Sequence, residues 1–153
     1  MNNAVHKKIT NCFENENWNF LWDEKNHVFT WGVKTENYTD PLNFMLYLED
    51  DYYIVYASSQ ILNVNADYVN ATLKLINEIN TQMIFGAFEY IESKSEVRFK
   101  LYVDCLKQAP SPAIIRRSIF LPAHMLIKYG SKISAVAGGK LTLAEALRTH
   151  KED

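Results

Sequence analysis

The sequence predicts an α+β fold in which helices pack on one face of an antiparallel sheet. Six short segments alternate apolar and polar residues, and short polar turns join them into hairpins. Segments with helical spacing separate the strand groups, so the predicted order is helix, four strands, helix, two strands, helix. The chain has 153 residues, of which 48% are hydrophobic and 13% aromatic. This is enough for one core, and we expect a single domain over residues 1–153, with its core at 15–147.

The N-terminal region predicts a short helix followed by an aromatic hairpin. Apolar residues at helical spacing indicate a helix over residues 4–15. Aromatic residues then alternate with other residues over 18–23 and again over 28–33, with a polar turn between them. All three tryptophans lie in this region, at Trp18, Trp22 and Trp31. We therefore expect a hairpin with one aromatic face.

The next two strands are predicted from Pro41 to Leu48 and from Tyr52 to Ala57. Four apolar residues define one face of the first of these strands: Leu42, Phe44, Leu46 and Leu48. Residues 49–51 are all acidic and form the turn. The first half of the chain thus predicts four antiparallel strands.

A second helix is expected over residues 65–82. Asn65 is a suitable N-cap, and Asp67 favours the positive end of the helix dipole. An isolated amphipathic helix is unstable in water, so its apolar stripe must rest on the sheet. That expected stripe is Val69, Leu73, Ile76, Ile79 and Met83.

The remaining strands are predicted over 84–92 and 96–104, joined by a turn at 93–95. The second of these has the clearest alternation in the chain, which is typical of a half-buried strand. Its apolar face is expected to carry Val97, Phe99, Leu101 and Val103, and its polar face Arg98, Lys100, Tyr102 and Asp104.

The C-terminal helix is expected to begin at Ser111, with Pro112 at its first position, and to end at Gly138-Gly139. Pro122 is expected to kink or break it, because proline removes a hydrogen bond and clashes with the preceding turn. Thr142 is a candidate cap for a short last turn over 143–148, and the charged tail beyond it is expected to fray.

This order and the residues around Gly86 resemble the YbjN-like family of candidate bacterial sensory transduction regulators, which share a fold with type III secretion chaperones. The resemblance rests on Ile76-Asn77-x-x-Asn80, Gly86-x-Phe88-Glu89, the strand Val97-Arg98-Phe99-Lys100, and the glycines after the last helix. It implies a small, often dimeric helix–sheet–helix domain without known chemistry. The related chaperones are acidic dimers that hold segments of other proteins, whereas this chain has a net charge of −2.

Composition and spacing argue against several function classes. A pI near 6.1 without a basic stripe argues against nucleic-acid binding by phosphate neutralisation. No signal peptide or membrane-spanning apolar run is present, so we expect a cytoplasmic protein. The two cysteines and four histidines are scattered, which predicts no metal site and no cofactor. The spacing of Cys105 and His124 does not favour a catalytic pair over two core residues, and we expect that the protein is not an enzyme.

Two candidate sites follow from the predicted sheet and the last helix. The sheet face opposite the helices is expected to mix tyrosine, basic and apolar residues, a composition typical of protein interfaces. The expected members of this partner-binding face are Met45, Tyr47, Tyr53, Arg98, Lys100 and Tyr102. An ordinary amphipathic outer face is the alternative. Arg116 and Arg117, near the start of the last helix, are candidates for contact with an anion or an acidic partner.

The leading hypothesis is a non-enzymatic, chaperone-like or regulatory protein-binding module that forms a homodimer. Its partner would be another protein or a peptide segment, bound at the outer sheet face or by strand addition at an exposed edge. The alternative is a small-molecule sensor or enzyme with a pocket between the C-terminal helix and the sheet, shaped by Pro122 and His124.

Overall fold

The computed structural model describes residues 3–36 and 38–150, and it confirms the predicted α+β class and element order. Three 3₁₀ turns, at Gln60–Leu62, Ala66–Tyr68 and Glu92–Lys94, lie between the main elements. The helices and strands are α1 (Asn3–Asn15), β1 (Leu21–Asp23), β2 (Val28–Val33), β3 (Leu42–Leu48), β4 (Tyr52–Ser58), α2 (Val69–Thr81), β5 (Ala87–Ile91), β6 (Glu96–Asp104), α3 (Pro112–Ala137) and α4 (Leu143–His150). The charged tail expected to fray, at 151–153, lies outside the described residues.

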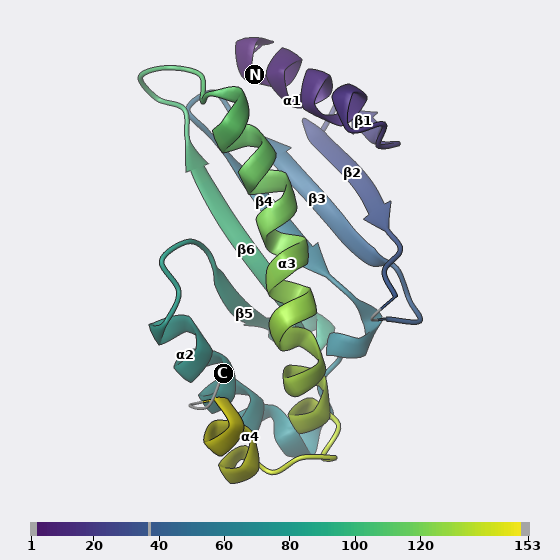
Figure 1. Cartoon of the computed structure of the whole chain (residues 1–153), viewed down its shortest axis with the longest axis vertical. Helices are drawn as coiled ribbons and strands as arrows, with labels where there is room; N and C mark the ends of the chain where they lie inside the picture. Colours follow the sequence, from purple (N-terminus) through teal and green to yellow (C-terminus); the bar gives the residue numbers. More distant parts are fainter. Residues whose placement is uncertain (1–2, 37, 151–153) are drawn as a thin grey trace.

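The six strands form one antiparallel sheet in the order β1-β2-β3-β4-β6-β5. Figure 1 shows α3 crossing one face of this sheet, with α1 beside it over the β1–β2 end. The helices α2 and α4 lie together near the end of α3 and beside β5. Within the described residues, no helix is long and apolar enough to span a membrane.

The core lies between the sheet and the helices on that face. Trp22 of β1 packs on Phe29 of β2 with ring centroids 4.4 Å apart, which confirms the predicted aromatic face of this hairpin. Trp31 of β2 also stacks on Phe44 of β3, at 5.0 Å. The strand predicted over 18–23 is shorter than expected, because only Leu21–Asp23 pair with β2. Trp18 nevertheless packs against the core, where its ring lies 4.7 Å from that of Phe120 in α3.

The predicted buried stripe of α2 is only partly correct. Ile76 and Ile79 are buried as expected, but Leu73 is 40% exposed and Leu75 is fully buried instead. The cause is the location of the helix, because α2 packs against α3, α4 and β5 rather than lying over the centre of the sheet. The predicted cap Asn65 accepts a hydrogen bond from the Asp67 N–H at 3.1 Å, but it caps the 3₁₀ turn Ala66–Tyr68, and α2 itself begins later, at Val69.

Pro122 does not break α3, whose 26 residues run without interruption from Pro112 to Ala137. A proline inside a helix costs about 3 kcal/mol. Packing of α3 against β4, β6, α1 and α2 along its length offsets that cost. The predicted cap is present, because the Ser111 side chain accepts a hydrogen bond from the Ile114 N–H at 3.3 Å. The helix ends before Gly139, whose φ of 73° is in the left-handed region.

Candidate functional site

The sheet face opposite α3 is the first candidate site, because none of the described helices covers it (Figure 1). Strand pairing places its side chains in rows, with Met45 beside Tyr56 and Lys100 in one row and Tyr47 beside Ile54 and Tyr102 in the next. We call this surface the outer tyrosine face. It consists of Met45, Tyr47, Tyr52, Ile54, Tyr56, Arg98, Lys100 and Tyr102.

The side chains of the outer tyrosine face are packed against one another. The rings of Tyr47 and Tyr56 lie edge to face at 5.8 Å, and those of Tyr52 and Tyr102 lie 5.4 Å apart. The Arg98 guanidinium lies 3.9 Å above the Tyr56 ring. These contacts hold the aromatic side chains in place before any partner arrives, which lowers the entropic cost of binding.

Two tyrosines of this face remain open to solvent. Tyr47 is 38% exposed and Tyr102 is 55% exposed. Arg98 also forms an ion pair with Glu89 of β5, with Nε 2.6 Å from Oε1, so its charge is partly satisfied within the sheet. The predicted members Met45, Tyr47, Arg98, Lys100 and Tyr102 therefore do share this face.

Tyr53 was wrongly assigned to the outer face. Its side chain is fully buried on the helix side of the sheet, with its hydroxyl oxygen 2.7 Å from Ser118 Oγ of α3. Ser118 Oγ itself donates to the Ile115 carbonyl at 2.8 Å, so Tyr53 is the donor to Ser118. Burial raises the pKa of Tyr53 above its ordinary value.

The two arginines of α3 have different surroundings. Arg116 Nε lies 2.6 Å from Glu16 Oε1, and its guanidinium lies 4.6 Å from the Phe120 ring centroid, so its charge is already paired. Arg117 stacks over the Phe85 ring at 4.3 Å, and no ion pair involves it within the described part of the chain. Of these two arginines, Arg117 is therefore the one better placed to receive an external carboxylate.

One border of the sheet is closed by a residue of the family-like motif. The Asn80 side chain donates to the Phe88 carbonyl at 2.9 Å and accepts from the Phe88 N–H at 2.8 Å. These two bonds occupy backbone groups of β5 in the way that a neighbouring strand would. Asn80 therefore blocks the edge of the sheet at β5, whereas Asn77 is exposed and takes no part.

The other end of β6 has no such neighbour. The strand β5 pairs with β6 only over Glu96–Lys100, because the chain leaves the sheet at Gly86. Gly86 has a φ of 74°, and a Cβ at this position would clash with the Phe99 ring and lie 2.7 Å from the Lys100 carbonyl oxygen. The strand predicted over 84–92 is therefore shorter at its start, and Phe85 is 48% exposed.

A groove of ≈ 410 Å³ lies between this unpaired part of β6 and α3. Its walls include Phe85, Leu101, Val103, Ile114, Arg117 and Leu121. The expected pocket between the C-terminal helix and the sheet is thus present, but different residues form it. Pro122 is buried, and His124 is exposed in an adjoining hollow, contrary to the expected role of both.

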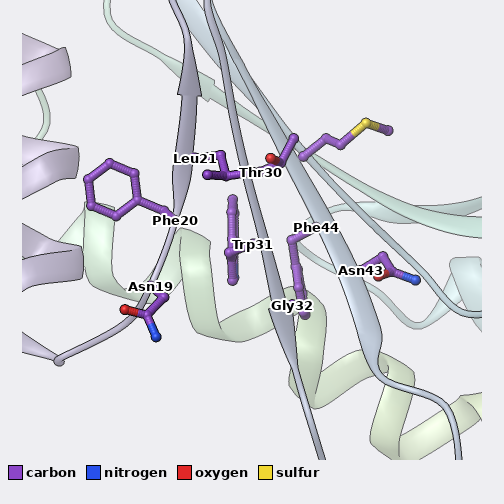
Figure 2. Close-up of a pocket in the computed structure, with 9 residues that line it drawn as sticks. Asn19, Phe20, Leu21, Thr30, Trp31, Gly32, Asn43 and Phe44 are labelled. Carbon is purple, nitrogen blue, oxygen red and sulfur yellow. The ribbon is translucent and has the colours of Figure 1, made fainter.

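A second hollow, of ≈ 470 Å³, opens where β1 begins only at Leu21 and leaves the adjacent end of β2 unpaired. Figure 2 shows Trp31 and Phe44 beside it, with Phe20 and Leu21 on the β1 side and the amides of Asn19 and Asn43 at its margin. None of its lining residues is titratable, so it offers no group for acid–base chemistry.

The thiols are poorly suited to nucleophilic chemistry. Cys105 is buried and Cys12 partly buried, and both are free. Burial raises the pKa of Cys105 to about 11 and also raises the pKa of Cys12, so both stay protonated near neutral pH. Among the side chains that the structure describes, no group of three or more His, Cys, Asp or Glu could hold a metal ion.

Comparison with known proteins supports the fold. No protein-family profile matches the sequence, and no curated protein matches it. Among solved structures, the chain is similar to YbjN from E. coli, which is described as a candidate transcription regulator. The TM-score is 0.57 at 9% sequence identity, and the match covers 82% of this chain and 90% of that chain. The chain therefore has a YbjN-like fold.

Proposed function

We propose that the protein is a non-enzymatic, cytoplasmic module that binds other proteins in a regulatory or chaperone-like role, and that it works as a homodimer. The observation that carries this proposal is the outer tyrosine face, where exposed Tyr47 and Tyr102 lie among packed tyrosine, arginine and methionine side chains. Tyrosine, arginine and methionine are enriched in protein interfaces, and tyrosine and arginine also dominate their energetic hot spots.

Pairing two copies of the chain through this face would bury aromatic surface that is exposed to solvent in the single chain. The rings are held by neighbours across β3, β4 and β6, so little side-chain freedom is lost on association. The ion pair between Arg98 and Glu89 keeps the face close to neutral at its β5 side, which suits contact with an identical surface.

A regulatory role is compatible with the structural neighbour, YbjN, which is described as a candidate transcription regulator. The net charge of −2 does not favour direct binding to phosphates of DNA. We therefore assign the regulatory effect to contacts with proteins.

The test compares Tyr47→Glu with Leu73→Glu by size-exclusion chromatography with light scattering. Tyr47 and Leu73 are similarly exposed, at 38% and 40%, but Leu73 lies on α2, away from the outer tyrosine face. A buried carboxylate in the interface should raise the dimer dissociation constant by about tenfold or more. Leu73→Glu should leave it unchanged. Equal dissociation constants for both variants and the parent chain would contradict the proposed interface.

A second candidate function, a small-molecule sensor or enzyme, is favoured by the groove between α3 and β6. A metabolite that binds the folded chain raises its melting temperature by mass action. Thermal-shift screening against metabolites, repeated with Leu121→Trp to fill the groove, separates this function from a pure protein-binding role. A ligand-dependent shift that disappears in this variant would support the sensor.

A further inference from the structure

We propose that the open edge of β6 and the adjoining groove bind an extended segment of a partner protein that adds as a strand and carries a carboxylate side chain to Arg117. This inference rests on the proposed protein-binding function and names the partner's chemistry. It depends on three features of the described residues: unpaired backbone groups, an apolar groove, and a cation without an ion-pair partner.

The hydrogen-bond pattern shows which backbone groups are free. The Cys105 N–H donates to the Asp51 carbonyl at 2.7 Å, and the Val64 N–H donates to the Ser95 carbonyl at 2.7 Å. Ser95 and Cys105 therefore direct these groups toward the β4 side of the sheet. Because backbone groups alternate along a strand, those of Tyr102 and Asp104 point to the opposite side.

That opposite side has no strand beyond Lys100, where β5 pairing ends. Within the described residues, no backbone hydrogen bond closes this edge at Tyr102 or Asp104. Two alternate residues offer two donors and two acceptors in register, which is the pattern that a partner strand requires.

The groove suits the side chains of such a strand. Side chains of an added strand alternate between the two faces of the sheet, and every second one would enter the space between β6 and α3. Leu101, Val103 and Leu121 line this space, and Phe85 and Ile114, about half exposed, lie at its margin. Apolar residues at alternate positions of the partner would therefore be buried here.

Arg117 selects the charge of the partner. It contributes to the groove and to two adjoining hollows along α3, and its guanidinium is held over Phe85 rather than by a carboxylate. Asp104 also lines this groove, but its carboxylate accepts from the Leu106 N–H at 2.8 Å, and within the described residues no ion pair joins it to Arg117. A planar guanidinium binds a carboxylate through two parallel hydrogen bonds, so an Asp or Glu is the expected anchor.

The other borders of the sheet are less suited to strand addition. Asn80 occupies the Phe88 backbone groups at the β5 border. The β1 border is only three residues long. At the edge of β6, free pairing groups and an apolar groove coincide with a cation that has no ion-pair partner among the described residues, whereas the hollow beside the unpaired part of β2 has no charged lining residue.

The test uses random 12-residue peptides displayed on phage, selected against the full chain, and a fluorescent synthetic copy of the enriched sequence. Enriched peptides should alternate apolar residues and contain Asp or Glu. By fluorescence polarisation, Arg117→Gln should weaken binding of the synthetic peptide about tenfold, which is typical for loss of a charge-assisted contact.

The edge is tested separately by Asp104→Pro, with Asp104→Asn as the matched control. Proline removes the outward N–H at the end of the strand, where it is tolerated, and should weaken binding at least tenfold, whereas asparagine keeps that N–H and should change it less than twofold. Absence of any enriched peptide, or equal affinity of the parent chain, Arg117→Gln and Asp104→Pro, would overturn the inference. If Asp104→Pro fails to fold, Arg117→Gln still decides the outcome.

Failure of this inference differs from failure of the proposed homodimer. Tyr47→Glu alters the outer tyrosine face and should change the mass of the protein without changing peptide affinity. Arg117→Gln should change peptide affinity and leave the mass unchanged. A monomer that still binds acidic, alternating peptides would preserve the inference and remove the homodimer.

Discussion

Replacing Asn80 with alanine removes the two hydrogen bonds that join α2 to the backbone of β5. The donor–acceptor distances are 2.9 and 2.8 Å, and both bonds are partly buried. Each is worth about 1 kcal/mol, and more where the backbone group is left without a partner, but water can reach part of this site. We therefore expect a loss of about 2 kcal/mol in the free energy of unfolding, relative to a helix-matched control.

Asn77→Ala is that control, because Asn77 lies on the same helix, is exposed and forms no side-chain hydrogen bond with any described residue. Both substitutions gain the same helix propensity, about 0.5 kcal/mol, so the difference between them isolates the two bonds. Urea unfolding, followed by tryptophan fluorescence at fixed protein concentration, measures this difference in the free energy of unfolding. In a thermal unfolding experiment, the melting temperature of Asn80→Ala should lie about 4–8 °C below that of Asn77→Ala. Asn80→Asp, which keeps only the acceptor, should lie between the two. Equal stabilities of Asn80→Ala and Asn77→Ala would refute the reasoning.

Three further predictions concern the core and its borders. Gly86→Ala should destabilise the fold by about 2 kcal/mol or more, measured by urea unfolding, because the added Cβ meets the Phe99 ring at a φ of 74°; a loss below about 0.5 kcal/mol would contradict it. Tyr53→Phe should cost about 1 kcal/mol by removing the donor to Ser118, and Ser118→Ala should add less in this background than in the parent chain. Cys105, with its pKa raised from 9.0 to about 11, should react with iodoacetamide at pH 8 about a hundredfold more slowly in the native than in the urea-unfolded chain. The thiol of Cys105 loses its proton at lower pH in the unfolded state than in the native state, so the free energy of unfolding should fall as pH rises from 9.0 to about 11. In Cys105→Ala this fall should be smaller.

The elements were predictable where alternation and capping residues agreed, and β6 is the clearest example. Its predicted bounds match the observed Glu96–Asp104. Which residues of β4 face the helices was not predictable from its pattern, because both faces of this strand carry large apolar or aromatic residues. The turn does contain the missing signal. A loop of only Asp50 and Asp51 sets Leu48 opposite Tyr53, and this pairing puts Tyr53 on the face of the buried leucine.

The open edge of β6 could not be predicted from the pattern alone. Residues 84–92 have the composition of a full-length strand, and only the left-handed backbone at Gly86 shows that the chain leaves β6 there. The partners of the two arginines could not be predicted either, because Glu16 is distant in sequence from Arg116 and Phe85 is distant from Arg117. Such contacts depend on tertiary packing, which local periodicity does not encode.

The most direct test of the proposed function is the mass of the unmodified chain, measured by light scattering over a concentration series from micromolar to millimolar. Pairing through the outer tyrosine face predicts a mass that rises with concentration to twice the 17.7 kDa of one chain. A mass that stays at 17.7 kDa throughout the series would contradict the homodimer and the role assigned to that face.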